Sequence, residues 1–320
     1  MKQQRLARIV SVGSSVPERI VTNKDLEQFL DTSDDWITSR TGIRQRHLFA
    51  KGEEAKLGDL GGKAAAAALA SAGCSAQDID GIICATFSPD CFFPSTACRI
   101  QQFIGNENAC AFDVSAACAG FVYALSIADA MIASGRCNRM LVVGAEITSR
   151  TVDWTDRSTC VLFGDAAGAV LLEANEGSNR GILSTYLNSN GTLGDILCLP
   201  AVGEKRFMKM NGNEVYKHAV RLMGEATEIC LAKAGFGFDK VDLLIPHQAN
   251  IRIINAMAKH MNLPREKVVT NLDKYGNTSS ASIPLALEEA WKDGRIKDDT
   301  VAVFTALGGG LVWGSAVVRF

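Results

Sequence analysis

One cysteine of this chain, Cys118, lies among residue types that could support nucleophilic catalysis. It belongs to DVSAACAGF, residues 113–121, whose small side chains leave room for a substrate carbonyl group. A strand-like run, CAFDV, precedes it and a helix-like run, GFVYALSIA, follows it, so we expect the thiol at a helix N-terminus. That position favours the nucleophilic thiolate, and its free N–H groups can hold an oxyanion. Free cysteine is also a common core residue, which is the expected role of most of the other nine.

A catalytic thiol needs a proton acceptor, and the chain has only four histidines. His247 alone directly follows a buried strand-like run, in LLIPHQAN. Ligands of open α/β sheets bind at the carboxyl ends of strands, so His247 is the candidate base. A loop histidine with a purely structural role fits the same position.

Two further segments have the composition of an active site. Asn277 lies in KYGNTSSASIP, residues 274–284, where small and hydroxyl residues precede a helix-like run. Helix capping is the alternative role for this asparagine. Three consecutive glycines, 308–310, lie in ALGGGLVWGSA and can expose backbone N–H groups to an oxyanion.

Strand-like and helix-like runs alternate along the chain, which predicts an α/β fold with mainly parallel, buried sheets. The expected strands are residues 9–13, 80–87, 138–146, 167–173, 241–246, 300–307 and 313–320. The expected helices are residues 60–73, 119–135, 213–235 and 282–294.

The sequence contains an internal repeat. LASAGCSAQDIDGII, from residue 69, aligns with LAKAGFGFDKVDLLI, from residue 231, at an offset of 162. A second pair of segments aligns on Gly135 and Gly294, at an offset of 159. Either match alone could be chance, but two in the same order favour a duplicated chain with halves 1–174 and 175–320. The second alignment places Cys118 on Asn277, across a pseudo-twofold axis.

Composition excludes several classes of protein. Lys and Arg number 33 against 35 Asp and Glu, so bulk attraction to nucleic acid or to an anionic membrane is not expected. No uninterrupted apolar run is long enough for a membrane span, and the N-terminal residues do not resemble a signal peptide. The scattered cysteines form no C-x-x-C pair, so we expect no metal site and a cytoplasmic location with reduced thiols.

Together these segments resemble the thiolase-superfamily condensing enzymes, and among them the 3-oxoacyl-(acyl carrier protein) synthase III family. The segments that carry the resemblance are DVSAACAGF, FGDAAGAVLLE, NGNEVYKHAV, PHQANIRII, YGNTSSASIP and GGGLVWGSAVVRF. The resemblance implies a duplicated five-layer α/β/α/β/α fold and a catalytic triad of Cys118, His247 and Asn277. The asparagine distinguishes this class from elongating synthases, which use a second histidine, and from thiolases, which use a second cysteine.

The resemblance also implies a reaction that needs neither a metal nor a redox cofactor. Acetyl-CoA, or another short acyl-CoA, acylates Cys118 as a substrate, and the backbone N–H groups of Cys118 and Gly310 hold the oxyanion. Malonyl-acyl carrier protein then loses carbon dioxide, and its enolate, held by His247 and Asn277, attacks the acyl group. The product is a 3-ketoacyl-acyl carrier protein, the first condensation product of dissociated fatty acid synthesis.

The family's binding residues can be placed on this sequence one by one. Those implied to contact CoA are Trp36, Arg40, Arg157, Asn213 and Asn250. Those implied to line the acyl pocket are Phe163, Leu307 and, across a homodimer interface, Phe93. Leu307 departs from the family's usual phenylalanine, which leaves the length of the starter acyl group open.

The acyl carrier protein is acidic and needs a basic docking surface. The family's docking segment matches Gln248, Ala249, Asn250, Ile251 and Arg252. Lys259, seven residues after Arg252, and Lys217 extend the candidate surface, although a solvated charged face explains such residues equally well.

Three other functions fit part of the sequence. A priming polyketide or quinolone-forming condensing enzyme shares the fold. A thiol hydrolase or transglutaminase also uses Cys, His and Asn, but leaves the repeat and Trp36 unexplained. A catalytically silent acyl-CoA binder does not need the intact triad.

Overall fold

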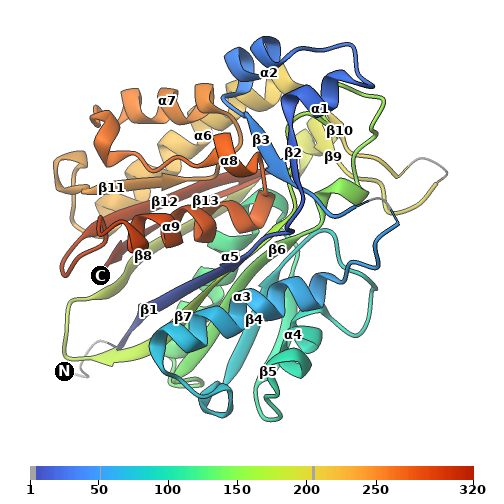
Figure 1. Ribbon diagram of the computed structural model, residues 1–320. Coiled ribbons are helices and arrows are strands. Elements are labelled where there is room, and N and C mark those ends of the chain that lie inside the picture. Colours follow the sequence, from blue (N-terminus) through green and yellow to red (C-terminus); the bar gives the residue numbers. More distant parts are fainter. Residues whose placement is uncertain (1–4, 51, 204–205) are drawn as a thin grey trace.

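The strand-like runs form two large sheets in the computed structural model, which describes residues 5–50, 52–203 and 206–320 (Figure 1). The first sheet has the strand order β1 (Arg5–Ser15), β7 (Ala166–Glu176), β6 (Arg139–Glu146), β4 (Gly81–Ala85), β5 (Cys110–Val114). The second has the order β11 (Leu243–Pro246), β12 (Val301–Gly308), β13 (Val312–Arg319), β8 (Gly181–Ser189).

Helices form three layers around these sheets. The first sheet is covered on its outer face by α3 (Leu57–Ala72) and α4 (Thr96–Ile104), and the second by α6 (Gly212–Lys233) and α7 (Ile251–His260). Between the sheets lie α5 (Gly120–Ala133) and α9 (Ser282–Lys292), as Figure 1 shows. Both central helices contact strands of both sheets, which explains why their sequences are apolar on more than one face. The expected five-layer fold is confirmed.

Shorter elements complete the molecule above the ends of the sheets. They are β2 (Ile20–Thr22), α1 (Asn23–Glu27), α2 (Asp34–Thr41), β3 (Gln45–His47), β9 (Leu197–Cys198), β10 (Lys209–Met210) and α8 (Leu272–Tyr275).

The two sheets repeat one pattern of pairing. The strand series β1-β7-β6-β4 of the first sheet corresponds to β8-β13-β12-β11 of the second. In each series the first two neighbouring pairs are antiparallel and the third is parallel. The parallel strand β5 continues the first series, and Val268 pairs in parallel with Leu244 at the matching edge of the second. We propose that the two halves of the duplication meet just after residue 174, in the last residues of β7 and before β8 begins.

The expectation of mainly parallel sheets was wrong. Only three of the seven neighbouring strand pairs in these two sheets are parallel. A parallel pair needs a crossover connection, usually a helix, whereas β12 and β13 are joined by the glycine turn and β6 and β7 by a loop without an α-helix.

The offset between equivalent elements of the two halves also differs from the 159 residues of the second sequence alignment. β4 and β11 begin 162 residues apart, as do β6 and β12, and α5 and α9. At the other end of the central helices, Gly135 and Gly294 are indeed equivalent, with φ of 77° and 78°. The offset falls to 159 there because α9 has 11 residues and α5 has 14.

Carrying the offset of 159 back to Cys118 was therefore wrong. A 3-10 turn precedes each central helix, Ala117–Ala119 before α5 and Ser279–Ala281 before α9. Each turn begins with a residue of positive φ, 44° at Ala117 and 51° at Ser279. The counterpart of Cys118 is Ser280, and Asn277 lies three residues earlier.

We predict that Gly144→Ala destabilises the fold. A Cβ atom at Gly144, on β6, would lie 2.2 Å from the carbonyl oxygen of Ser280. Because this oxygen belongs to the backbone, it cannot move away by a change of side-chain rotamer. The expected loss in free energy of unfolding is about 1–3 kcal/mol, measured by denaturant titration. Gly191→Ala is the control, because a Cβ there meets nothing within 4 Å. Equal stability of the two variants would contradict the close contact.

Candidate active site

The expected catalytic residues line one cavity. Its volume is about 820 Å³, and Cys118, His247 and Asn277 all contribute to its wall. Other predicted site residues on this wall are Trp36, Arg40, Phe163, Asn213, Ala249, Asn250, Arg252, Leu307 and Gly310. The structure thus brings together side chains from α2, from the turn before α5, and from the segments after β11 and β12.

Cys118 occupies the tight turn between β5 and α5. The left-handed φ of Ala117 is unusual for a residue with a side chain, and such strain is typical of functional turns. Gly308 lies directly against this turn, since a Cβ there would come within 2.6 Å of the Cys118 backbone nitrogen. The first of the three glycines is therefore required by close packing, while Gly309 and Gly310 face the cavity.

The Cys118 thiol is buried, and burial raises its pKa to about 12. The Ser279 hydroxyl donates a hydrogen bond to the sulfur across 3.2 Å, which lowers this pKa by less than burial raises it. The backbone N–H of Cys118 also lowers this pKa, again by less than burial raises it. The resting group is a neutral thiol, so attack on a carbonyl requires a proton acceptor.

His247 follows β11 as expected, and its hydrogen bonds determine which ring nitrogen carries the proton. Its Nδ1 lies 2.7 Å from the Ser282 hydroxyl, which also accepts the Gln248 backbone N–H across 3.4 Å. Among the described residues the Ser282 O–H has no acceptor other than Nδ1, so we assign its proton to that bond, which places the ring proton on Nε2. Burial lowers the pKa of His247 to about 4, so the ring is neutral at pH 7.

Asn277 is held by the backbone beside the cavity. Its N–H donates to the Leu162 carbonyl across 2.8 Å, and its own carbonyl accepts the Gly164 N–H across 3.0 Å. The side-chain oxygen accepts the Ser279 N–H across 2.9 Å. This is a local bond to the residue two positions on and not a helix cap, since neither the Ser279–Ala281 turn nor α9 has a side-chain cap, so the capping alternative was wrong. With Oδ1 engaged, the side-chain amide group is a hydrogen-bond donor.

The candidate nucleotide-binding residues gather around Trp36. The guanidinium carbons of Arg40 and Arg157 lie 5.0 and 5.4 Å from the centre of its ring. A base between Trp36 and Arg157 would need a van der Waals contact on each side, about 7 Å in total. Arg157, which also bonds Asp31, must therefore move if an adenine is to stack between them.

Asn250 connects this region to the helix behind His247. Its side-chain oxygen accepts the Arg252 N–H across 2.8 Å and caps α7, and its amide nitrogen donates to the Arg40 carbonyl across 3.1 Å. The guanidinium of Arg252 stacks 5.3 Å from the ring centre of Tyr216, on α6. The mouth of the cavity is therefore basic.

Several predicted residues lie away from the cavity wall. Lys217 and Lys259 are exposed on α6 and α7, and Ile251 packs against Gly42. Phe93 is 87% exposed on the loop after β4.

The assignment of Gln248 to the docking surface was wrong. Its side chain is buried and bonds the carbonyl oxygens of Pro246 and Val269 and the N–H of Asn271. Gln248 therefore fixes the loop after β11 from within.

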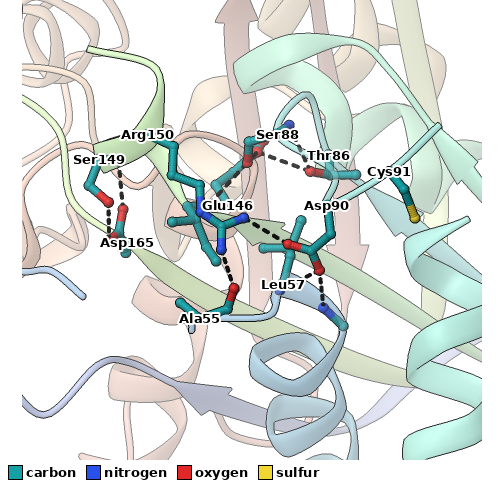
Figure 2. A network of polar contacts seen from close by, with 12 residues as sticks. Ala55, Leu57, Thr86, Ser88, Asp90, Cys91, Glu146, Ser149, Arg150 and Asp165 are labelled. Atoms are coloured by element: carbon teal, nitrogen blue, oxygen red, sulfur yellow. Dashed lines mark hydrogen bonds and ion pairs between the residues drawn. The ribbon is translucent and has the colours of Figure 1, made fainter. Parts of the chain in front are cut away.

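A buried carboxyl group at the end of β6, Glu146, was not predicted from the sequence. It accepts hydrogen bonds from Ser88 (2.6 Å), Thr86 (3.1 Å) and Ser280 (3.0 Å), and Figure 2 shows the first two of these residues beside it. Burial raises the pKa of Glu146 to about 7. The available signal was an acidic residue that ends an otherwise apolar strand, MLVVGAE, which is unusual unless the acid is paired.

Two classes of site were not found in the part of the chain that the structure describes. Within it, no three His, Cys, Asp or Glu side chains are grouped closely enough to bind a metal ion. No helix in residues 5–50, 52–203 and 206–320 combines the length and apolar character of a membrane span.

Comparison with known proteins agrees with this geometry. Family models described as 3-oxoacyl-[acyl-carrier-protein (ACP)] synthase III and as its C terminal match residues 112–191 and 231–320. The beta-ketoacyl-[acyl-carrier-protein] synthase III of Acidiphilium cryptum (strain JF-5) is 52% identical, covering 97% of this chain and 98% of that protein. The synthase of the same name from Xanthomonas campestris pv. campestris is 48% identical, covering 100% of both.

Solved structures show the same fold. The crystal structure of 3-oxoacyl-[acyl-carrier-protein] synthase III from Aquifex aeolicus VF5 has a TM-score of 0.94 and 46% identity, covering 98% of this chain and 100% of that one. The priming beta-ketosynthase of the R1128 polyketide pathway has a TM-score of 0.92 and 32% identity, covering 100% and 98%. The fold and the thiol-bearing cavity are those of the thiolase-superfamily condensing enzymes. Within that class, the chain belongs to the 3-oxoacyl-[acyl-carrier-protein] synthase III family.

We predict that His247 makes the protein less stable in acid. The unfolded chain binds a proton at this residue below pH 6.5, whereas the folded ring stays neutral down to about pH 4. The stability contribution is therefore present above pH 6.5 and is lost as the pH falls, by about 3 kcal/mol in total. Denaturant titrations of wild type and His247→Asn between neutral and acidic pH measure it. Parallel pH profiles for the two proteins would contradict the buried neutral ring.

Proposed function

We propose that Cys118, His247 and Asn277 catalyse the initiating condensation of dissociated fatty acid synthesis. The observation that carries the proposal is that one cavity is lined by a thiol, a neutral imidazole and a carboxamide donor. In the first step the Cys118 sulfur attacks the carbonyl carbon of acetyl-CoA or another short acyl-CoA. The backbone N–H groups of Cys118 and Gly310 hold the oxyanion until CoA leaves.

In the second step malonyl-acyl carrier protein loses carbon dioxide. The negative charge that develops on its thioester oxygen is stabilised by the Nε2–H of His247 and the amide of Asn277. The enolate carbon attacks the acyl carbon, and Cys118 leaves as the 3-ketoacyl-acyl carrier protein forms. Neutral donors suit this step because they add no charge to a dry cavity.

Both substrates carry long, flexible thioester arms, which suits a deep cavity with a basic mouth. CoA would pass Asn213 and Asn250 with its nucleotide at Trp36, Arg40 and Arg157. The acyl group would lie near Phe163 and Leu307. The acidic carrier protein would dock on Arg252, Lys259 and Lys217, together with the exposed parts of Ala249, Asn250 and Ile251.

The protein is proposed to act as a homodimer. Phe92 and Phe93 are each 87% exposed, and β5 is an edge strand of the first sheet. Exposed aromatic side chains beside an open strand edge are typical of an interface between subunits. Phe93 would then complete the acyl pocket of the partner. All ten cysteines are free thiols, which suits a reducing compartment such as the cytoplasm.

Secondary metabolism is the weaker assignment. The polyketide-priming relative is 32% identical, whereas full-length relatives at 48–52% are beta-ketoacyl-[acyl-carrier-protein] synthases III. A hydrolase would release free acid from the acyl-enzyme.

The two steps can be separated by intact-protein mass spectrometry. We predict that wild type gains one acetyl group from acetyl-CoA, that Cys118→Ala gains none, and that folded Asn277→Ala still gains it. After malonyl-acyl carrier protein is added, wild type should lose the acetyl group as a 3-ketoacyl product. Asn277→Ala should do so about 10²–10⁴-fold more slowly. Acetylation of Cys118→Ala, or release of free acetate by wild type, would overturn the proposal.

The docking surface can be tested with charge reversals. Because Arg252 lines the cavity as well as the surface, Lys259→Glu is the sharper variant, and we predict that it raises KM for malonyl-acyl carrier protein several-fold. Its rate of acetyl transfer from acetyl-CoA should stay at the wild-type value. Lys63→Glu, on the exposed side of α3, is the matched control. Equal effects on both substrates would argue against docking at Lys259.

A further inference from the structure

Glu146 is a buried carboxyl group beside the nucleophile with no cation to balance it. Its side chain is fully buried, and its hydrogen-bond partners among the described residues are hydroxyl groups and the Phe87 N–H. No ion pair involves Glu146 among the residues that the structure describes. Burying an unpaired carboxylate is costly, and four hydroxyl groups and one backbone N–H offset this cost only in part, since burial still raises the pKa of Glu146. The triad described above gives this residue no role.

Ser279 connects this carboxyl group to Cys118. Its hydroxyl oxygen lies 3.2 Å from the Cys118 sulfur and 3.5 Å from Oε1 of Glu146. In the resting arrangement the Ser279 O–H points to the sulfur; for a proton to pass, this O–H turns to Oε1 of Glu146 and the Cys118 S–H donates to the Ser279 oxygen, so the hydroxyl group accepts one proton while it donates its own. The chain holds Ser279 in this place through its left-handed φ of 51° and its N–H bond to Asn277.

His247 is poorly suited to take the proton of the thiol. With Nδ1 bonded to Ser282, its Nε2 already carries a hydrogen and is a donor. That donor is the group needed for the enolate in the second step. The acylation step therefore needs another acceptor within reach of the sulfur.

We propose that the Cys118 proton passes through the Ser279 hydroxyl to Glu146, and that this transfer generates the attacking thiolate. The S–H bond breaks as Ser279 accepts the proton, and the original Ser279 proton moves to Oε1 of Glu146. The thiolate adds to the acyl-CoA carbonyl, the bond from that carbon to the CoA sulfur breaks, and the leaving CoA thiolate takes the proton back through the same hydroxyl. Glu146 ends as a carboxylate.

The charge balance of the pocket favours this route. A thiolate beside an ionised Glu146 would place two negative charges close together in a buried region. Proton transfer from Cys118 to Glu146 keeps the number of negative charges at one throughout. Within the described part of the chain, the buried Cys84 thiol on β4 also faces Glu146, and it in turn faces Asp113 on β5. Asp165, in the same view of Figure 2, binds a separate set of partners: Ser149, Thr148 and Phe49.

The test measures the rate of Cys118 acetylation as a function of pH. The reaction is quenched rapidly, and the acetylated fraction is read from the mass of the intact protein. This inference rests on Cys118 being the nucleophile, so Cys118→Ala is included. The variants are Glu146→Gln, Ser279→Ala and the double variant, with Asp165→Asn as a matched control for loss of a buried carboxylate. Unfolding curves are measured for each. The ultraviolet absorbance of the thiolate reports the ionisation of Cys118 separately from the rate.

The relay predicts that the wild-type rate rises with pH as Glu146 ionises and becomes able to accept a proton. Glu146→Gln should lose this dependence and acetylate about tenfold or more slowly, although its thiolate forms at lower pH because a negative charge has been removed. Ser279→Ala should be slowed similarly, and the double variant no further, since both residues act in one path. Asp165→Asn should keep the wild-type pH profile.

Acetylation of Glu146→Gln at or above the wild-type rate would overturn the relay. A result in which Ser279→Ala is acetylated more slowly than wild type but Glu146→Gln is not would overturn it as well. If wild type is not acetylated at Cys118, the proposed function itself fails, and that outcome is distinct from failure of the relay.

Discussion

The active site depends on a crossed contact at the centre of the molecule. β6 of the first sheet packs against the turn that begins α9, and β12 of the second sheet packs against the turn that begins α5. Both contacts need a glycine, Gly144 facing the Ser280 carbonyl and Gly308 facing the Cys118 nitrogen. Each half of the chain therefore supports the functional turn of the other half, and one half alone would have only part of the cavity.

The cavity works with neutral groups rather than with an ion pair. Burial raises the pKa of Cys118 and lowers that of His247, so both rest uncharged. This arrangement suits a chemistry in which negative charge appears twice, on an oxyanion and on an enolate, and is held by hydrogen-bond donors. It also explains why Ser279 and Ser282 matter, because each fixes one functional side chain by a single hydroxyl group.

Features with a local signal could be predicted from the sequence. The central helices end at glycines, the core strands are apolar runs, and Cys118, His247 and Asn277 each stand next to such an element, so their positions could be inferred. The position of β8 was missed because GILSTYLNS alternates weakly and its partner β13 lies far along the chain. The burial of Gln248 and Glu146 was missed for a related reason. Their hydrogen-bond partners come from segments far away in the sequence, and no pattern of residue spacing predicts these contacts.

The 162-residue register pairs Cys118 with Ser280, and it also pairs Glu146 with Gly308. An ancestral dimer of identical halves would have had two equivalent sites, each with the same residues at these four places. In the present chain one turn has a sulfur where the other has a hydroxyl group, and one strand end has a carboxyl group where the other, at Gly308, has no side chain because the Cys118 turn packs against it. The two halves therefore differ in role: the first supplies the sulfur and the carboxyl group, and the turn of the second bonds both. Equivalent backbone positions in the two halves thus carry different chemistry, which gives the single cavity a direction.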